Sequence, residues 1–394
     1  MIRLSTHLAP WAPGGIPLAW RQLLADRKRF AVAVAGVAFG ALLMLFQLGI
    51  YQAFMVMVLR PIDAMTGDLA MISRDFQYFM ATEGFPERRL YQTLADPEVA
   101  EVYPVMIRFG SWRNPETRRQ YEIALLGVRP FANPFQAPEI RAWNLIFKTA
   151  DGALYDAGST PEYGAVAALL ARDGTLTGEF NKRRLRVHGT FQLGQTLAAY
   201  GHILVGAEAF RRLTDRRDST IELGMIRLRD PDAAGRVIER LNARLPPDVE
   251  VLTRADFQRR EQTYWQNNTP IGFIVTAGMI IAMFVGAVIV YQILYTDIND
   301  HLKVYATLKA LGLSDGFFTR LILQQGTLLP LFGVVPALAL SAILFRLADT
   351  LGGLPTRLTL PDTLTVLGLT ILMCVLASLL ALRRLRAADP ADIF

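Results

Sequence analysis

Four long apolar runs limit what this 394-residue chain can fold into. One lies near the start, over residues 30–59, and three lie near the end, over 271–295, 321–347 and 362–382. Each is long enough to cross about 30 Å of hydrocarbon as a helix. The intervening residues, 60–268, have no run of membrane length and read as ordinary aqueous-domain sequence. The sequence therefore predicts a membrane α-helical protein, one plus three helices, with a large α/β extracytoplasmic domain.

Basic residues beside the runs predict the orientation, because loops rich in Lys and Arg stay in the cytoplasm. They form three clusters: Arg21, Arg27, Lys28 and Arg29; Lys303, Lys309 and Arg320; and Arg383, Arg384 and Arg386. Segments 1–29, 296–320 and 383–394 are then cytoplasmic, and both termini lie inside. The large domain and a hairpin over 348–361 lie on the outer side.

Composition is consistent with half a membrane protein and half an aqueous domain, since hydrophobic residues make up 52% of the chain. The net charge of +6 is explained by the flanking clusters and by contact with anionic membrane lipid, so no nucleic acid partner is expected. The single cysteine, Cys374, lies in the fourth run. The outer domain therefore has no disulfide and depends on its own core.

The outer domain reads as two similar units separated by an insertion. Strands are predicted at Asp68–Ile72, Val99–Ile107, Tyr121–Val128, Ile221–Leu228 and Val249–Leu252, and helices at Pro86–Leu94 and Asp232–Leu245. These patterns predict a ferredoxin-like, porter-type layer from residues 62–128 and 220–253. The Pro- and Gly-rich residues 129–219 are predicted to form an inserted, β-rich lobe.

Two stalks are predicted to connect this domain to the membrane. The first run has 30 residues, which as a helix exceed the bilayer thickness. On the other side, 254–268 reads as a stalk helix, after which Thr269 and Pro270 restart a helix as a cap and a first-turn proline. Movement of the stalks would reach the outer domain directly.

The predicted membrane helices have no Asp, Glu, Lys, Arg or His near their centres. Coupling to a proton or sodium ion is therefore not expected. Gln47, Gln52 and Gln292 are the main polar residues, and hydrogen bonds between helices are favoured over a substrate path. Gly36 and Gly40 form a small-xxx-small pair that permits close helix packing in the first run.

No catalytic, cofactor-binding or metal-binding residues are predicted. The four histidines are scattered without the spacing of metal ligands, and no Walker A loop is present. If ATP drives this protein, ATP and Mg²⁺ bind to a separate chain.

The segment between the second and third runs contains a predicted helix, His301–Leu311, which Gly312 ends. On physical grounds this helix could dock on a partner or lie in the lipid interface. The letters YATLKALG, at Tyr305–Gly312, resemble the cytoplasmic motif of FtsX/MacB-type ABC permeases.

A closer resemblance is to the DevC-type ABC exporter permeases of this mechanotransmitting superfamily. It runs through Leu18–Gly49, Leu193–Ala209, Arg260–Leu311 and Arg384–Phe394. At the entry to the second run it includes Tyr264, Trp265, Asn267, Asn268 and Pro270.

The resemblance implies the permease subunit of an exporter in the bacterial inner membrane, working as a homodimer. It also implies a separate ABC ATPase subunit, a periplasmic membrane-fusion adaptor and a TolC-like outer-membrane channel. The surface that couples to the ATPase would be Tyr305, Ala306, Thr307, Leu308, Lys309, Ala310 and Leu311, with Gly312 as the helix end. Val304 departs from the family pattern, which commonly has an acidic residue there, so the particular polar contacts to the ATPase differ.

Two alternatives remain open from the sequence. One is an FtsX-like mechanotransmitter that regulates a periplasmic cell-wall hydrolase, and the other is a lipoprotein-release permease. The large outer domain favours the exporter. No pattern in the sequence indicates the cargo.

Overall fold

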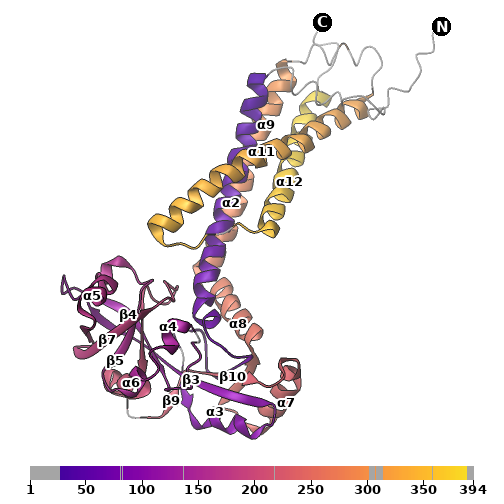
Figure 1. Cartoon of the computed structure of the whole chain (residues 1–394). Coiled ribbons are helices and arrows are strands. Elements are labelled where there is room, and N and C mark those ends of the chain that lie inside the picture. The colour runs from indigo at the N-terminus through magenta and orange to yellow at the C-terminus, as the bar shows by residue number, and fades with distance from the viewer. Residues whose placement is uncertain are drawn as a thin grey trace. The chain divides into compact units, whose positions relative to one another are not determined.

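The computed structural model describes residues 27–79, 81, 83–135, 137–216, 218–300, 307, 314–356 and 358–387. The chain separates into two compact units (Figure 1). The helical unit lies within Met1–Ala53 and Ile271–Phe394, and the α/β unit is Phe54–Pro270. The predicted coupling residues other than Thr307 lie outside the described part of the chain.

The long helices are α2 (Arg27–Asp63), α9 (Pro270–Asp300), α11 (Asp315–Gly352) and α12 (Leu360–Ala387). By length and composition, four spans in the described residues could cross a membrane: Arg27–Asp63, Pro270–Asp300, Thr319–Thr350 and Leu360–Leu382. Each contains one of the predicted apolar runs. The 37 residues of α2 correspond to about 55 Å at the usual rise per residue, which is longer than a bilayer core.

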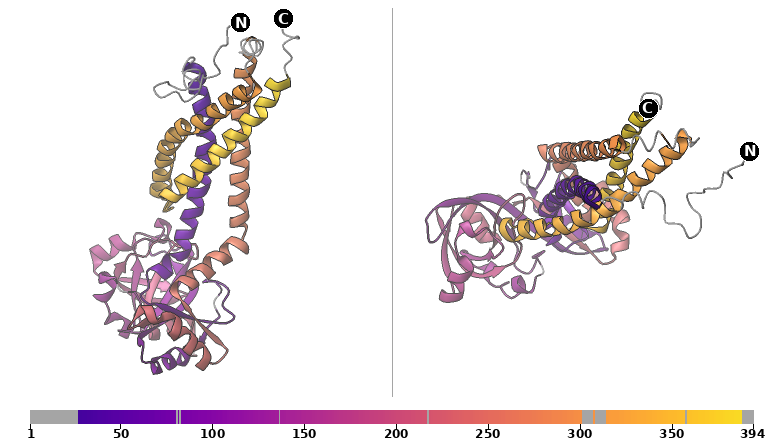
Figure 2. Two further views of the ribbon diagram at one scale, coloured as in Figure 1. Left: turned by 90° about the vertical axis from the view of Figure 1, so that its right-hand side faces the viewer. Right: turned by 90° about the horizontal axis from the view of Figure 1, so that it is seen from above.

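The helical unit is held together by apolar packing along its helices. Figure 2 shows α2 next to α9, and α11 packs against α12. Buried side chains at helical spacing, such as Val37, Ala41 and Met44 of α2, form its core with residues from the other three helices. A helix buries such a stripe because residues three and four apart lie on one face.

The first half of the α/β unit is a split β-α-β arrangement. Its elements are β1 (Leu69–Ser73), α3 (Arg88–Gln92), η1 (Thr93–Ala95), β3 (Val99–Arg113), β10 (Leu223–Leu228), η4 (Pro231–Ala233), α7 (Ala234–Arg244) and β11 (Val249–Thr253). The strands lie in the order β11-β1-β10-β3, and each neighbouring pair is antiparallel. This is the ferredoxin-like order, as the sequence pattern predicted. A short pair, β2 (Phe85–Pro86) and β9 (Thr220–Ile221), lies beside it.

The second half extends the same sheet into a ring. Its strands are β4 (Gln120–Val128), β5 (Gly152–Asp156), β6 (Leu176–Phe180), β7 (Arg183–Phe191) and β8 (His202–Gly206). Its helices are α4 (Pro138–Arg141), η2 (Ile146–Lys148), η3 (Pro161–Tyr163), α5 (Val166–Asp173) and α6 (Ala207–Thr214). The pairings β3-β4-β8-β5-β7-β6 close back on β3.

The ring differs from the separate inserted lobe that the sequence predicts. β3 has 15 residues, and while its first half pairs with β10, its last residues pair with β6. β4, which precedes the predicted boundary at residue 129, pairs with β8, which follows it. The inserted residues therefore close a ring of strands together with β3 and β4 and do not form a separate lobe. This is possible because β3 is long enough to pair in both halves of the sheet.

The two faces of the sheet are covered by different elements. Helices α3, α5, α6 and α7 cover one face, where Leu90, Phe210 and Val237 are buried. The other face is covered by α4, η2, the last residues of α2 and the helix α8 (Arg254–Asn267). The chain therefore enters and leaves the α/β unit through two helices that pack on the same face of its sheet.

Candidate functional site

The predicted coupling residues Tyr305, Ala306, Leu308, Lys309, Ala310, Leu311 and Gly312 lie outside the described residues. Thr307 is described and is helical and exposed. The predicted ATPase-coupling surface therefore stays a prediction. The sites that the structure does describe lie in the helical unit and at the stalk ends.

In the helical unit, the predicted polar and small residues lie at helix contacts. Gln47 Nε2 donates to the carbonyl oxygen of Ile274 at 3.2 Å, and Gln52 Nε2 donates to Asp362 Oδ1 at 3.1 Å. These bonds join α2 to α9 and α12, which agrees with the interhelical role expected of the glutamines. Gln292 is exposed on α9.

The two glycines of α2 lie where α9 approaches within the same chain. A Cβ atom on Gly36 would be 2.6 Å from Ile289 Cγ2, and one on Gly40 would be 3.0 Å from the Cα atom of Gly286. Both distances are too short for a side chain without movement of a neighbour. In this structure the small-xxx-small pair serves packing inside one chain.

The ends of the two stalk helices are joined by direct hydrogen bonds, and we call these contacts the α2–α8 junction. Arg254 Nη2, at the start of α8, donates to the carbonyl oxygens of Ile62 at 3.1 Å and Asp63 at 3.0 Å. One turn later, Gln258 Nε2 donates to Asp63 Oδ1 at 2.6 Å. The last carbonyls of a helix lack partners within it, and a cation there also interacts favourably with the helix dipole. Arg254 therefore caps α2 from another helix.

Further along α8, Glu261 holds the loop that follows β1, and we call this group the Glu261 clamp. The Phe79 N–H donates to both carboxylate oxygens of Glu261, at 3.1 and 3.2 Å, and Trp265 Nε1 donates to Oε1 at 3.0 Å. Tyr78 stacks on Tyr264, with 4.3 Å between ring centroids. The loop is thus tied to the stalk by a buried carboxylate and covered by aromatic rings.

The carboxyl group of the Glu261 clamp is buried without a charged partner in the described residues, and its pKa is raised. Burial raises the pKa of the Glu261 carboxyl, and the bonds from Trp265 and Phe79 offset that effect only in part. Its hydrogen-bond partners in the described residues are neutral N–H groups. A buried carboxylate without a paired cation favours the protonated form.

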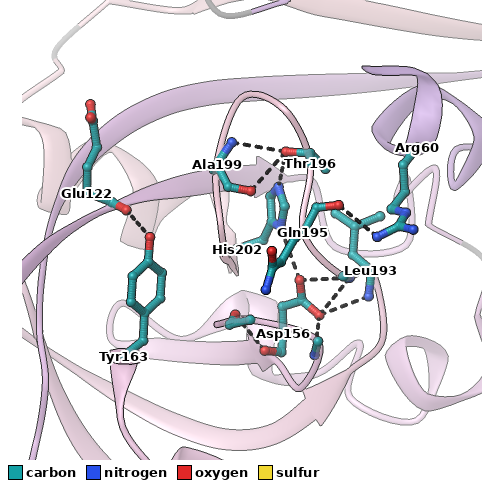
Figure 3. A network of polar contacts seen from close by, with 12 residues as sticks. Arg60, Glu122, Asp156, Tyr163, Leu193, Gln195, Thr196, Ala199 and His202 are labelled. Atoms are coloured by element: carbon teal, nitrogen blue, oxygen red, sulfur yellow. Dashed lines mark hydrogen bonds and ion pairs between the residues drawn. The ribbon is translucent and has the colours of Figure 1, made fainter. Parts of the chain in front are cut away.

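The end of α2 is also fixed to the ring through the loop Leu193–Tyr200, which Figure 3 shows. Arg60 Nη1 donates to the carbonyl oxygen of Gln195 at 2.7 Å. Beneath the loop, Asp156 accepts hydrogen bonds from the N–H groups of Leu193 and Gly194 at 3.0 to 3.1 Å. We call this the Asp156 network.

The Asp156 network also includes a buried histidine. His202 Nδ1 lies 3.0 Å from Asp156 Oδ2, and His202 Nε2 lies 3.3 Å from Thr196 Oγ1. Burial alone would raise the pKa of Asp156, but the bond and charge of His202 and the two backbone N–H groups outweigh it and lower the pKa. The ionised carboxylate is therefore the form that holds the loop.

The remaining predicted residues lie at the break between α8 and α9. Asn267 is the last residue of α8, the N–H of Asn268 donates to the Tyr264 carbonyl at 2.8 Å, and Pro270 begins α9. The helix restart at Pro270 is confirmed. Thr269 Oγ1 donates to the Trp265 carbonyl at 2.5 Å, so its side chain completes the end of α8.

Several functional candidates were missed from the sequence. Glu261 and Trp265 are four residues apart on a helix that was predicted, so their shared face was a usable signal. Asp156 and His202 are 46 residues apart, and no local pattern connects them. In the described residues, no group of three or more His, Cys, Asp or Glu side chains is arranged to hold a metal ion.

The chain is similar to known permeases in part of its length and over nearly its full length. A model described as the FtsX-like permease C-terminal domain matches residues 276–390. An ABC transporter permease of Mycobacterium bovis is 25% identical over 382 residues, covering 95% of this chain and 98% of that protein. An ABC transporter permease of Mycobacterium tuberculosis shows the same identity and coverage.

Two solved structures are similar to part of the chain at 12% identity. The extracellular domain of the noncanonic ABC-type transporter YknZ from Gram-positive bacteria has a TM-score of 0.32, covering 47% of this chain and 98% of that one. The periplasmic region of MacB from Actinobacillus actinomycetemcomitans has a TM-score of 0.35, covering 52% and 97%. TM-scores this low do not establish a shared function. The chain therefore contains an FtsX-like permease C-terminal domain at residues 276–390 and is, over nearly its full length, a homologue of mycobacterial ABC transporter permeases.

Proposed function

We propose that this permease transmits the motion of a separate ABC ATPase through α2 and α8 to the α/β unit, and so drives export. The α/β unit would be periplasmic and both termini cytoplasmic, in the bacterial inner membrane. The observation that carries the proposal is that both stalk helices end on one face of one sheet and are bonded to each other there. A displacement of either helix would then move the sheet as a unit.

The membrane helices support a mechanical role over a substrate channel. The four apolar spans have no charged residue at their centres, and the described glutamines of α2 bond to neighbouring helices. A channel for a polar cargo needs polar groups that are exposed along its path. Cargo would instead be moved by the periplasmic domain.

The assembly that we propose is a homodimer with two copies of the ATPase subunit, which binds ATP and Mg²⁺. A periplasmic membrane-fusion adaptor and a TolC-like outer-membrane channel would receive the cargo. The DevC-type resemblance and the size of the α/β unit, Phe54–Pro270, support this arrangement. The ATPase would dock on Tyr305–Leu311.

The docking step is tested by Leu308→Glu. A charge in the apolar docking surface should abolish co-purification of the ATPase subunit while membrane insertion and dimer formation remain. The matched control is Leu94→Glu, a 47% exposed leucine in the α/β unit, which should leave the association intact. Equal recovery of the ATPase with both variants would contradict the docking surface.

The transmission step is tested by Arg254→Met, which removes two of the three hydrogen bonds from α8 to the end of α2 and leaves the one from Gln258. In the complex with the ATPase, a fluorescent probe at the exposed position 208 should lose its response to ATP, although ATP hydrolysis continues. The control is Arg259→Met on the same helix, because Arg259 pairs only with Asp256 of α8 in the described residues. A normal response in the Arg254 variant would refute transmission through the junction.

Affinity purification from the native membrane then decides the partners. Recovery of an ATPase and a coiled-coil adaptor is expected. Recovery of a cell-wall hydrolase, or of an ATPase with no adaptor, would replace export with regulation or lipoprotein release.

A further inference from the structure

A pocket of about 190 Å³ lies at the end of α11, where the chain turns back toward α12. Its lining residues all belong to the helical unit and are Ala342, Phe345, Arg346, Asp349, Thr356 and Leu358. Arg346 falls inside the apolar span Thr319–Thr350, close to its end. The pocket is therefore at the depth of the membrane interface, and a cation and an anion both line it.

One side of this pocket is formed by the turn after α11, which begins at a glycine. Gly353 has a left-handed φ of 62°, and its N–H donates to the Asp349 carbonyl at 3.0 Å. This is the glycine helix end that permits the chain to reverse. Thr356 then lies over the last turns of α11, where its Oγ1 donates to the Phe345 carbonyl at 3.1 Å.

The inner wall of the pocket is rigidly packed. Phe345 is 4% exposed and stacks on Phe46 of α2, with 6.4 Å between ring centroids. Gly49 of α2 makes room for it, since a Cβ atom there would lie 2.2 Å from Phe345 Cζ. Leu358 packs against the core of the helical unit. The pocket is thus part of the packed bundle, whereas its opposite side is open.

The chemistry of the polar lining fits a phosphate and an ammonium group together. Arg346 and Asp349 are exposed, one turn apart on α11. An arginine side chain binds phosphate oxygens with two parallel N–H groups, and a carboxylate accepts from an ammonium group. The hydroxyl proton of Thr356 is already donated to a carbonyl, so its oxygen lone pairs remain available as acceptors.

The apolar part of the pocket lining is formed by Ala342 and Phe345 of α11 and by Leu358 after the turn. Ala342, Phe345, Arg346 and Asp349 are three or four residues apart, which places them on one face of the helix. The apolar side chains can therefore contact the start of an acyl chain whose headgroup lies on Arg346 and Asp349.

We propose that this pocket binds one zwitterionic phospholipid of the ethanolamine class, with its phosphate on Arg346, its ammonium group toward Asp349 and Thr356, and the start of an acyl chain against Ala342 and Leu358. An anionic lipid would satisfy Arg346 but place no cation near Asp349. The proposal requires only that the helical unit lies in a membrane. It does not depend on export or on any partner subunit.

The test uses the full chain reconstituted in lipid nanodiscs that contain equal amounts of phosphatidylethanolamine and phosphatidylglycerol. Native mass spectrometry after release into detergent counts the phospholipids that stay bound. Wild-type protein should retain phosphatidylethanolamine in preference to phosphatidylglycerol. Arg346→Gln should reduce retained lipid by about tenfold, as expected when a charged hydrogen-bond partner is lost. Asp349→Asn should abolish the preference but keep the lipid.

The matched control is Arg320→Gln, an exposed arginine near the other end of α11, which should leave the preference unchanged. Circular dichroism establishes that each variant is folded. Equal retention of the two lipids by wild type, or a preference that survives Asp349→Asn, would overturn the proposal and leave Arg346 as an unspecific interfacial anchor. Phosphoethanolamine without acyl chains should not displace the bound lipid, and displacement by it would overturn the role of the acyl chain.

Discussion

At the scale of single residues, two buried carboxyl groups near the stalk ends have pKa values that are shifted in opposite directions. Asp156 has a histidine partner and a lowered pKa, whereas Glu261 has neutral donors and a raised pKa. The difference follows from the partner, because a charge removed from water is stabilised only when another group replaces the lost solvation. The two sites therefore respond differently to pH and to substitution.

Glu261→Gln should remove a pH dependence of stability. A raised pKa in the folded state means that the stability contribution of Glu261 is present below its ordinary value of 4.5 and is lost as the pH rises through the raised value. The glutamine variant keeps an acceptor for the Phe79 N–H but cannot titrate. The thermal unfolding temperature of the full chain in detergent is measured from pH 4.5 upward. As the pH rises, this temperature should fall for the wild type relative to the variant. Parallel curves would show that Glu261 does not titrate differently in the folded state.

Asp156→Asn should destabilise the α/β unit by about 1–3 kcal/mol, because the amide cannot accept all of the N–H groups that the carboxylate accepts. The loop that carries Gln195 would loosen, and with it the contact to Arg60. The measurement is chemical unfolding of the full chain.

The control for the Asp156 variant is Asp173→Asn. Asp173 forms an exposed pair with Arg172, and such pairs contribute little. A loss of stability no larger than that of this control would contradict the role of the Asp156 network.

At the scale of elements, the long helices are placed by small residues as much as by large apolar ones. Gly36 and Gly40 allow α9 to pack closely against α2, and Gly49 leaves space for the side chain of Phe345 of α11. The pattern of small residues was visible in the sequence. Which helix they would contact was not, because the same glycine pair also suits a contact between two chains.

Gly40→Leu should destabilise the helical unit by about 1–3 kcal/mol, because overpacking forces neighbouring backbones apart. The matched control is Gly368→Leu in α12, where an added Cβ atom would meet nothing within 4 Å. The thermal unfolding temperature of the monomeric protein in detergent should be lower for Gly40→Leu than for the wild type and unchanged for Gly368→Leu. If Gly40→Leu alters dimer formation but not monomer stability, the glycine belongs to an interface between chains.

At the scale of the whole molecule, the orientation in the membrane is open to a direct test. In a Cys374→Ser background, cysteines replace Glu208 of the α/β unit and Thr307 of the segment that is predicted to be cytoplasmic, both exposed positions. A membrane-impermeant maleimide applied to spheroplasts should label position 208 at once, and position 307 only after the membrane is permeabilised. The reverse pattern would invert the proposed topology.

The sequence by itself determined the four apolar spans, the ferredoxin-like half of the α/β unit and the break at Pro270. These features depend on local periodicity, on apolar length and on single residues such as Gly and Pro, which act within a few positions. The likeness to FtsX-like permeases was also readable, because Tyr305–Gly312 carry it in one continuous stretch.

Only the tertiary structure decided the rest. β3 is long enough to serve two halves of the sheet, so the insertion closes into a ring with β3 and β4. Arg254 meets the end of α2 from 192 positions away, and His202 meets Asp156 from 46. Contacts of this kind have no local pattern, because they arise when separate elements are packed on a common face and each buried polar group must find a partner there.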